Sequence, residues 1–140
     1  MYVNLQTMSK ISSNFSLAEM IRTSQPIANR PDLTSTINLC YGVHKILQPL
    51  RDHLRCAVTI TSAYRSTAVN KAVGGNPNSQ HLIGCAADCV VPASVKSEAI
   101  DFITRNLPFD QLLVGKSFFH VSWTVDKTPR RQRIDDYYNY

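Results

Sequence analysis

A single acidic residue inside an apolar segment constrains this chain more than any other feature. Residues 85–91 read CAADCVV, a short apolar run that ends at Pro92, and Asp88 is its one charged residue. Such a run predicts a buried strand. An ionised carboxylate is strongly disfavoured in that environment unless it is paired. We therefore expect Asp88 to face a cation or a group of hydrogen-bond donors.

The first half of the chain predicts helices. Residues 16–19, SLAE, form a capping box, in which a serine hydroxyl and a glutamate carboxylate satisfy amides at the start of a short helix. Residues 35–54 carry apolar side chains at helical spacing and predict the main buried helix. Pro49 lies inside this segment, so it is expected to kink the helix or to end its first part.

The second half predicts shorter elements in alternation. Strands are expected at residues 57–61, 85–91, 111–114 and 118–123, and helices at residues 66–73 and from Ser94 or Ser97 to Leu107. Gly74 and Gly75 follow the first of these helices, since glycine permits the left-handed exit that a tight turn requires. The expected fold class is α+β, with N-terminal helices packed on a small antiparallel sheet.

Length and charge limit the organisation of the chain. The length of 140 residues predicts one compact domain at 14–125, preceded by an arm at 1–13 and followed by a basic, tyrosine-rich tail at 126–140. The net charge of +5 favours anionic partners such as a bacterial cell wall or nucleic acid. The basic residues of the tail have two interpretations: they form a solvated surface, or they bind cell-wall polymer or nucleic acid. No apolar run approaches the roughly 20 residues that span a bilayer, so membrane insertion is not expected.

The four cysteines predict free thiols. They lie in apolar periodic segments, and no secretory signal precedes them, which disfavours disulfides. Cys85 and Cys89 have the spacing of a metal half-site, but Cys40 and Cys56 do not supply a matching second pair.

Two histidines and the buried acid have the chemistry of a metal site. A catalytic zinc ion takes three nitrogen or oxygen ligands and keeps one position open for water. His81 lies in the loop before the Asp88 strand, and His120 lies in the strand predicted at 118–123. Isolated histidines also occur as ordinary core or surface residues, and that interpretation is preferred for His44 and His53 on the long helix.

The motifs together resemble a known family. The chain contains SAYR ending at residue 65, an asparagine at 70, VGG at 73–75, SQHLIGCAAD ending at residue 88, and FFHVSW ending at residue 123. This pattern resembles the zinc D-Ala-D-Ala peptidases of the hedgehog/DD-peptidase fold, in particular their small phage-type members. The resemblance extends to NFSLAEMIRTS and LQPLR in the first half and covers roughly residues 14–125.

The resemblance implies a role for each matching residue. His81, Asp88 and His120 would bind Zn²⁺, and Arg65 would hold the substrate or stabilise the oxyanion. Further candidates are Ser79, Gln80 and Trp123 for the substrate, and Asn70, Gly74 and Gly75 for the turn that makes Arg65 and His81 face one another. Ser79 is equally suited to capping its loop, and Trp123 to the edge of the core.

One expected residue is missing from the pattern. The family usually supplies a glutamate or aspartate as general base, at positions that hold Gly115 and Ser117 here. The base is therefore unidentified. Asp110 is a weak candidate that also fits a turn or cap. General acid–base assistance typically contributes roughly 100- to 10,000-fold in rate.

The sequence thus predicts a monomeric zinc metallopeptidase, a hydrolase that cuts bonds at D-amino acids in peptidoglycan, as a phage endolysin does in cell wall degradation. The action would be that of a D-Ala-D-Ala carboxypeptidase or endopeptidase. Without a signal peptide, it would be made in the host cytoplasm and act at the wall or from the virion. The alternative is a weak or inactive zinc-binding module that recognises peptidoglycan. A small nucleic-acid-binding domain is the least favoured interpretation, because it leaves Asp88 unexplained.

Overall fold

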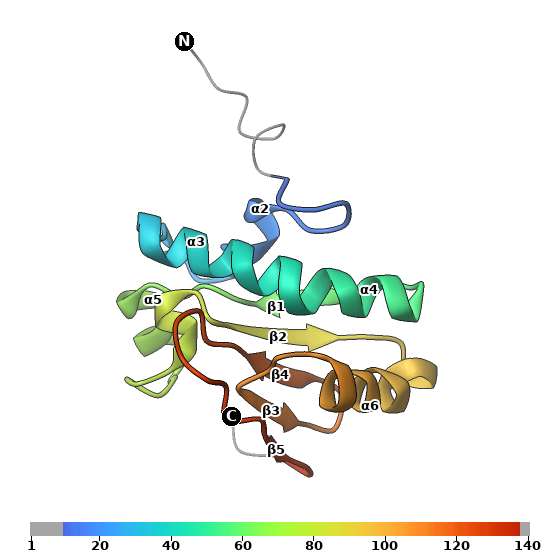
Figure 1. Ribbon diagram of the computed structural model, residues 1–140. Helices are drawn as coiled ribbons and strands as arrows, with labels where there is room; N and C mark the ends of the chain where they lie inside the picture. The colour runs from blue at the N-terminus through green and yellow to red at the C-terminus, as the bar shows by residue number, and fades with distance from the viewer. Residues whose placement is uncertain (1–9, 138–140) are drawn as a thin grey trace.

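A five-stranded sheet lies at the centre of the computed structural model, which describes residues 10–137 (Figure 1). The strands are β1 (Thr59–Ser62), β2 (Ala86–Val90), β3 (Gln111–Val114), β4 (Phe119–Ser122) and β5 (Gln132–Ile134). Their order is β1-β2-β4-β3-β5, and the first three pairings are antiparallel, as the sequence predicts. With its helices, this is an α+β fold. Residues 1–9 of the predicted arm and residues 138–140 of the tail lie outside the described part.

The polar tail contributes a strand that no sequence pattern indicates. β5 pairs parallel with β3, and all of its residues are exposed. Backbone pairing holds this strand: Gln132 donates its N–H to the carbonyl of Asp110, and Tyr137 donates its N–H to the carbonyl of Val114. A hydrophobic alternation is absent because neither face of β5 is buried.

One long helical segment covers the sheet (Figure 1). It consists of α3 (Leu33–Gly42), a π-helical turn (Val43–Leu47) and α4 (Gln48–Leu54), which follow one another without a break. The irregularity predicted for Pro49 falls in the turn before it. A proline ring crowds the carbonyl four residues earlier, here that of Lys45, and the wider π turn contains that residue.

The short helices are fixed by local signals. In α2 (Leu17–Met20), Ser16 and Glu19 form the predicted capping box. Helix α5 (Thr67–Ala72) is capped by the Ser66 hydroxyl, which accepts from the N–H of Val69. A 3₁₀ turn (Gln80–Ile83) precedes β2.

Helix α6 (Lys96–Asn106) departs from the prediction at its start. Neither Ser94 nor Ser97 caps it, so that expectation is wrong, because a 3₁₀ turn (Ala93–Val95) runs directly into the helix and supplies its first backbone bonds. At the other end, the Arg131 guanidinium donates to the carbonyls of Thr104 and Leu107.

The core lies between the long helix and the sheet. Its largest fully buried side chains are Trp123, Phe15, Phe109, Phe119, Met20, Leu39, Ile46, Leu47, Leu50, Ile60, Ile103 and Leu112. The Trp123 indole N–H donates to the carbonyl of Asn38 at 2.9 Å. None of the helices within residues 10–137 has both the length and the apolar composition of a membrane span.

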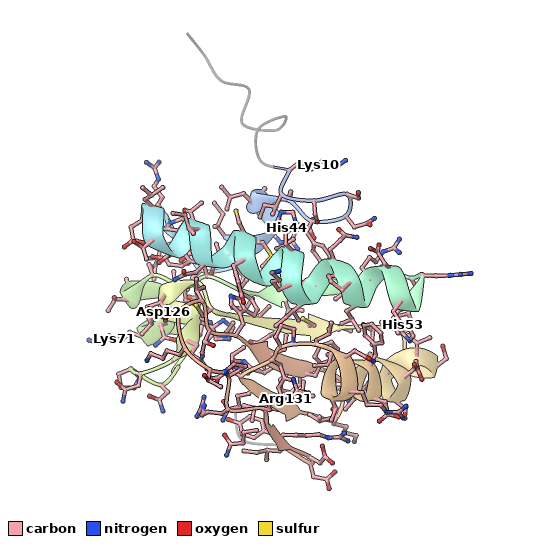
Figure 2. The ribbon with its side chains drawn as sticks, in the orientation of Figure 1. Lys10, His44, His53, Lys71, Asp126 and Arg131 are labelled. Carbon is pink, nitrogen blue, oxygen red and sulfur yellow. The ribbon has the colours of Figure 1, made fainter. Side chains whose placement is uncertain are left out.

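Polar side chains point outward from this core (Figure 2). His44 is exposed on the long helix, and His53 contacts Glu98 at 2.7 Å and stacks on Phe102 of α6. Both are surface residues of the helix, as predicted. All four cysteines are free, with Cys40 and Cys56 half-buried and the other two buried.

Candidate metal centre

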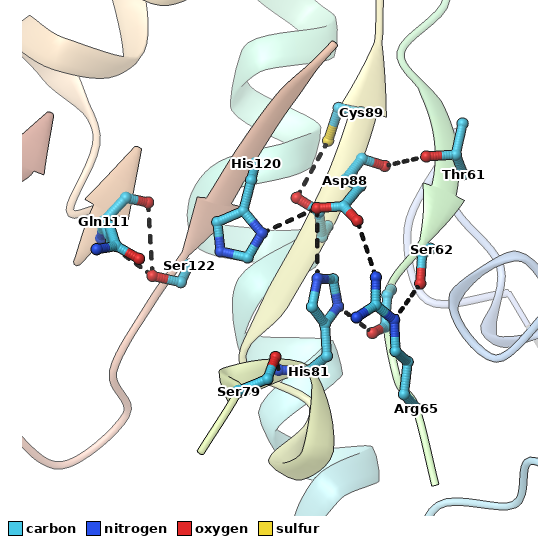
Figure 3. Close-up of polar contacts among 12 residues, drawn as sticks. Thr61, Ser62, Arg65, Ser79, His81, Asp88, Cys89, Gln111, His120 and Ser122 are labelled. Carbon is cyan, nitrogen blue, oxygen red and sulfur yellow. Dashed lines mark hydrogen bonds and ion pairs between the residues drawn. The ribbon is translucent and has the colours of Figure 1, made fainter. Parts of the chain in front are cut away.

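Two neighbouring strands place a carboxylate and an imidazole side by side. Asp88 of β2 and His120 of β4 are directly opposite one another in the antiparallel register. Side chains alternate along a strand, and Ala87 and Cys89 on the other face of β2 are buried in the core. Asp88 and His120 therefore project from the face away from the long helix (Figure 3).

His81 reaches the same place from the 3₁₀ turn before β2. The Ser79 hydroxyl caps this turn by accepting from the N–H of His81 at 3.2 Å. Gly84 ends the turn with φ +75°, and a Cβ there would lie 2.4 Å from the carbonyl oxygen of Ser35. Glycine is thus required for both conformation and space, and it directs the chain from His81 into the buried strand.

The His81 and His120 rings both contact one oxygen of Asp88. Asp88 Oδ1 lies 2.8 Å from His120 Nδ1 and 3.3 Å from His81 Nε2. One ligand atom from each residue lies within 4.8 Å of the others, close enough to hold a single metal ion. Two imidazole nitrogens and a carboxylate oxygen form a ligand set that Zn²⁺ accepts. The residues therefore fit the metal that the sequence predicts.

The orientation of His81 supports this fit. Its Nδ1 lies 2.6 Å from the carbonyl oxygen of Ala63, which holds the ring so that Nε2 points to Asp88. Metal-binding histidines commonly donate their other N–H to such a carbonyl. Burial lowers the pKa of His81, which favours the neutral imidazole that a metal requires.

Asp88 is ionised despite its position in the strand. Burial opposes the charged form, but the contacts of the carboxylate with His120 and His81 outweigh it and hold the pKa of this carboxyl well below its usual range. The second oxygen, Oδ2, accepts from Arg65 Nη2 at 3.1 Å. The carboxylate therefore meets the histidines on one side and a guanidinium on the other, which satisfies the expectation set by its sequence.

Arg65 is fixed by a small network around the Asn70 turn. Its Nε donates to Ser62 Oγ at 2.9 Å, and its Nη1 donates to Asn70 Oδ1 at 3.3 Å. Gly74 has φ +73°, whereas Gly75 is needed for space, since a Cβ there would lie 2.1 Å from Asn70 Oδ1. The predicted turn residues thus lie beside Arg65, and the N–H of Arg65 also donates to the carbonyl of His81.

Trp123 does not have the predicted contact with a substrate. Its side chain is 0% exposed and packs against Gly42 of the long helix. A fully buried ring cannot stack on a bound molecule, so the expectation is wrong for Trp123. The alternative interpretation, a core aromatic, is the one that this burial supports.

Asp110 and Gln80 form a separate polar group. Asp110 is buried and receives a two-pronged ion pair from Arg130, with Nη2 2.8 Å from Oδ2. Gln80 Nε2 donates to the same oxygen at 3.1 Å and to the carbonyl of Trp123. Burial opposes ionisation of Asp110, but the Arg130 contacts outweigh it and lower its pKa. A carboxylate held in this way is poorly suited to accept a proton.

A cleft of about 1010 Å³ lies over the three candidate ligands. Its lining includes Arg65, Ser79 and Gln80. Among the described residues that line it, Asp88 is the one carboxylate. The described part of the cleft therefore offers no separate carboxylate as general base.

Two residues that shape the site were not predicted from the sequence. Asn29, in the proline-containing segment before the long helix, bonds the carbonyl of Tyr64 and the N–H of Ser66, on either side of Arg65. Arg130 of the tail lines the cleft. The sequence showed Arg130 as one member of a basic cluster, and it gave no signal for Asn29.

The fold and the converging side chains define an α+β protein with a candidate metal site in a cleft. Residues 13–122 match the family model described as Peptidase M15. The chain therefore belongs to the zinc D-Ala-D-Ala peptidase (M15) family, whose members are zinc-dependent hydrolases. No curated protein sequence matches the chain.

Proposed function

We propose that this protein is a zinc metallopeptidase that hydrolyses peptide bonds next to D-amino acids in bacterial peptidoglycan. His81, Asp88 and His120 would hold the zinc ion. The observation that carries the proposal is their convergence, with all ligand atoms within 4.8 Å, in a cleft that Arg65 borders. The resemblance to small phage-type members favours a monomeric lysis or virion-associated enzyme that acts at the cell wall.

The residues of the cleft suit such a reaction. A bound zinc ion supplies an acidified water and polarises the carbonyl under attack. Arg65 carries a permanent charge, and its bonds to Asp88, Ser62 and Asn70 fix its direction. We expect it to bind the oxygen on which negative charge develops, because a preorganised donor costs no reorganisation during the reaction.

The composition of the cleft also favours a second candidate function. Without a general base among its described residues, hydrolysis is expected to be roughly 100- to 10,000-fold slower than with one. At the slow end of this range the protein would act as a zinc-dependent module that binds peptidoglycan.

Zinc titration and hydrolysis together test the proposal. Zinc affinity is measured by competition with a chromophoric chelator, and hydrolysis by new amino groups released from purified peptidoglycan. Asp88→Asn and His120→Ala are expected to weaken zinc binding by at least roughly 100-fold and to abolish release. His44→Ala, which removes an exposed histidine from the long helix, is the matched control and should change neither.

Three results separate the possibilities. Zinc-dependent release of amines, stopped by chelator, supports the peptidase. Stoichiometric zinc without release supports the recognition module. Zinc affinity that is the same in wild type and in Asp88→Asn refutes the metal centre itself.

A further inference from the structure

The segment after β4 returns to the cleft and forms part of its wall. Arg130, Ile134 and Tyr137 line the same cleft as His81 and His120. These three residues lie beyond residues 13–122, which the family model matches. The cleft of this chain therefore contains side chains that the matched region does not provide.

Buried polar contacts fix Arg130 in this wall. Its backbone N–H donates to Asp110 Oδ1 at 2.8 Å, and its Nε and Nη2 donate to the same carboxylate at 2.8–3.2 Å. The Asp110 side chain is only 4% exposed, so one edge of the guanidinium is anchored below the surface. Gln80, which precedes His81 in the chain, also bonds this carboxylate.

The other edge of Arg130 remains open. The side chain is 57% exposed, Nη2 makes one further, long contact with Gln80 Oε1 at 3.5 Å, and Nη1 has no hydrogen bond to any described residue. Arg65, the other arginine of the cleft, is instead only 16% exposed and uses all three of its guanidinium nitrogens in bonds to neighbouring side chains. The two arginines thus differ: Arg65 is mostly buried and pairs with the candidate metal ligand Asp88, whereas Arg130 is more exposed and its Nη1 makes no bond to a described residue.

We infer that Arg130 binds a carboxylate group of the peptide that occupies the cleft. This inference rests on the proposed function and specifies its substrate as an acidic peptide. A planar guanidinium recognises a carboxylate through paired N–H donors, and one that is held in place loses little freedom on binding. The carboxylate is either the free C-terminus of the peptide or an acidic side chain within it.

Peptide binding tests the inference independently of hydrolysis. The probe is a tripeptide analogue that ends in D-Ala-D-Ala, with its lysine amines acetylated and its last peptide bond replaced by an uncleavable ketomethylene group, titrated into zinc-loaded protein by calorimetry. If Arg130 binds the C-terminus, Arg130→Gln is expected to weaken binding of this probe by roughly tenfold or more. Arg130→Lys, which keeps the charge and can still pair with Asp110, should bind with intermediate affinity.

Arg133→Gln is the matched control. Arg133 lies three residues away and loses the same charge, but it pairs with Asp135 and lines a different cavity. Its substitution should leave peptide affinity unchanged. Zinc titration of each variant verifies that the metal centre is intact before peptide is added.

Two further peptides identify the carboxylate. If the C-terminus is the ligand, a C-terminal amide binds wild type and Arg130→Gln equally weakly. If an acidic side chain is the ligand, an amidated peptide that contains D-glutamate still distinguishes the two proteins. Either pattern supports the inference.

Equal affinity of wild type and Arg130→Gln for every peptide refutes it, as does an equal loss of affinity for peptides with and without a carboxylate. If Arg130→Gln does not fold, the peptide affinity of Arg130→Lys relative to wild type tests the inference instead. The proposed function fails separately: Arg130-dependent binding without hydrolysis removes the peptidase and keeps the carboxylate site. Hydrolysis at the same rate in wild type and Arg130→Gln, with equal peptide affinity, keeps the peptidase and removes the carboxylate site.

Discussion

The substitution Gly42→Ala places two physical effects in opposition. Gly42 has helical backbone angles, φ −63° and ψ −37°, so helix propensity alone predicts that alanine stabilises the protein by about 1 kcal/mol. A Cβ at this position, however, would lie 2.0 Å from Trp123 Cε2. Carbon atoms pack at roughly 3.5–4 Å, so the ring would have to move by more than about 1 Å.

The Trp123 ring has little room to move. It is 0% exposed, and its N–H bond to Asn38 would weaken as the ring shifts. Overpacking costs about 1–3 kcal/mol and loss of a hydrogen bond about 1 kcal/mol. After subtraction of the propensity gain, we expect Gly42→Ala to lower the free energy of unfolding by about 1–3 kcal/mol.

Urea unfolding measures this loss through the fluorescence of Trp123, the single tryptophan of the chain. Gly74→Ala is a useful comparison, because Gly74 has φ +73° and no neighbour within 4 Å of an added Cβ, so its cost of about 1–2 kcal/mol comes from the backbone alone. The double variant Gly42→Ala with Trp123→Phe, followed by circular dichroism, should show a favourable coupling, since phenylalanine leaves room for the methyl group. A Gly42→Ala protein as stable as wild type would refute the packing argument.

Three other predictions concern titration, reactivity and the support of Arg65. Because the pKa of Asp110 is lowered in the folded protein, its pair with Arg130 stabilises the fold above the unfolded pKa of about 3.9, and this stabilisation is lost as pH falls through the folded value. The difference in free energy of unfolding between wild type and Asp110→Asn, measured in urea, should therefore become smaller from pH 7 to pH 3. A difference that stays constant with pH contradicts this prediction. Burial raises the pKa of Cys85 to about 11, so alkylation at pH 8, followed by mass spectrometry, should modify half-buried Cys40 and Cys56 before Cys85; early labelling of Cys85 would show that the core opens. Asn29→Ala should cost about 1–3 kcal/mol in urea unfolding, because it leaves buried backbone groups beside Arg65 unpaired; no change in stability would mean that water replaces the amide.

The residues of the candidate metal centre could be singled out because burial is visible in the sequence and because the motifs resemble a known family. Asp88 stands out in an apolar run, and the alternation in residues 118–123 separates His120 from the residues that face the core. The same alternation also explains why Trp123 is buried. It has the same parity as Phe119 and Val121, which are both buried, so its burial follows from the strand period.

Other features depend on contacts that distant residues make. Asn29 reaches Ser66 across 37 positions, and Arg130 reaches Asp110 across 20. Both lie in irregular polar segments, where no periodicity indicates a partner. The start of α6 differs from its prediction for a local reason, since a 3₁₀ turn replaces the side-chain cap that Ser94 or Ser97 would supply.

The exposed fifth strand has a consequence for solubility. β3 contains Leu112 and Leu113, both buried, and β5 occupies its outer edge. A chain cut after residue 125 would leave β3 with unpaired N–H and carbonyl groups beside apolar side chains, which is a template for pairing with another molecule. β5 presents Arg133 at that boundary, and a charged edge of this kind discourages sheet-to-sheet association. We therefore expect the tail to limit aggregation, because it ends the sheet in a strand that other chains do not readily extend.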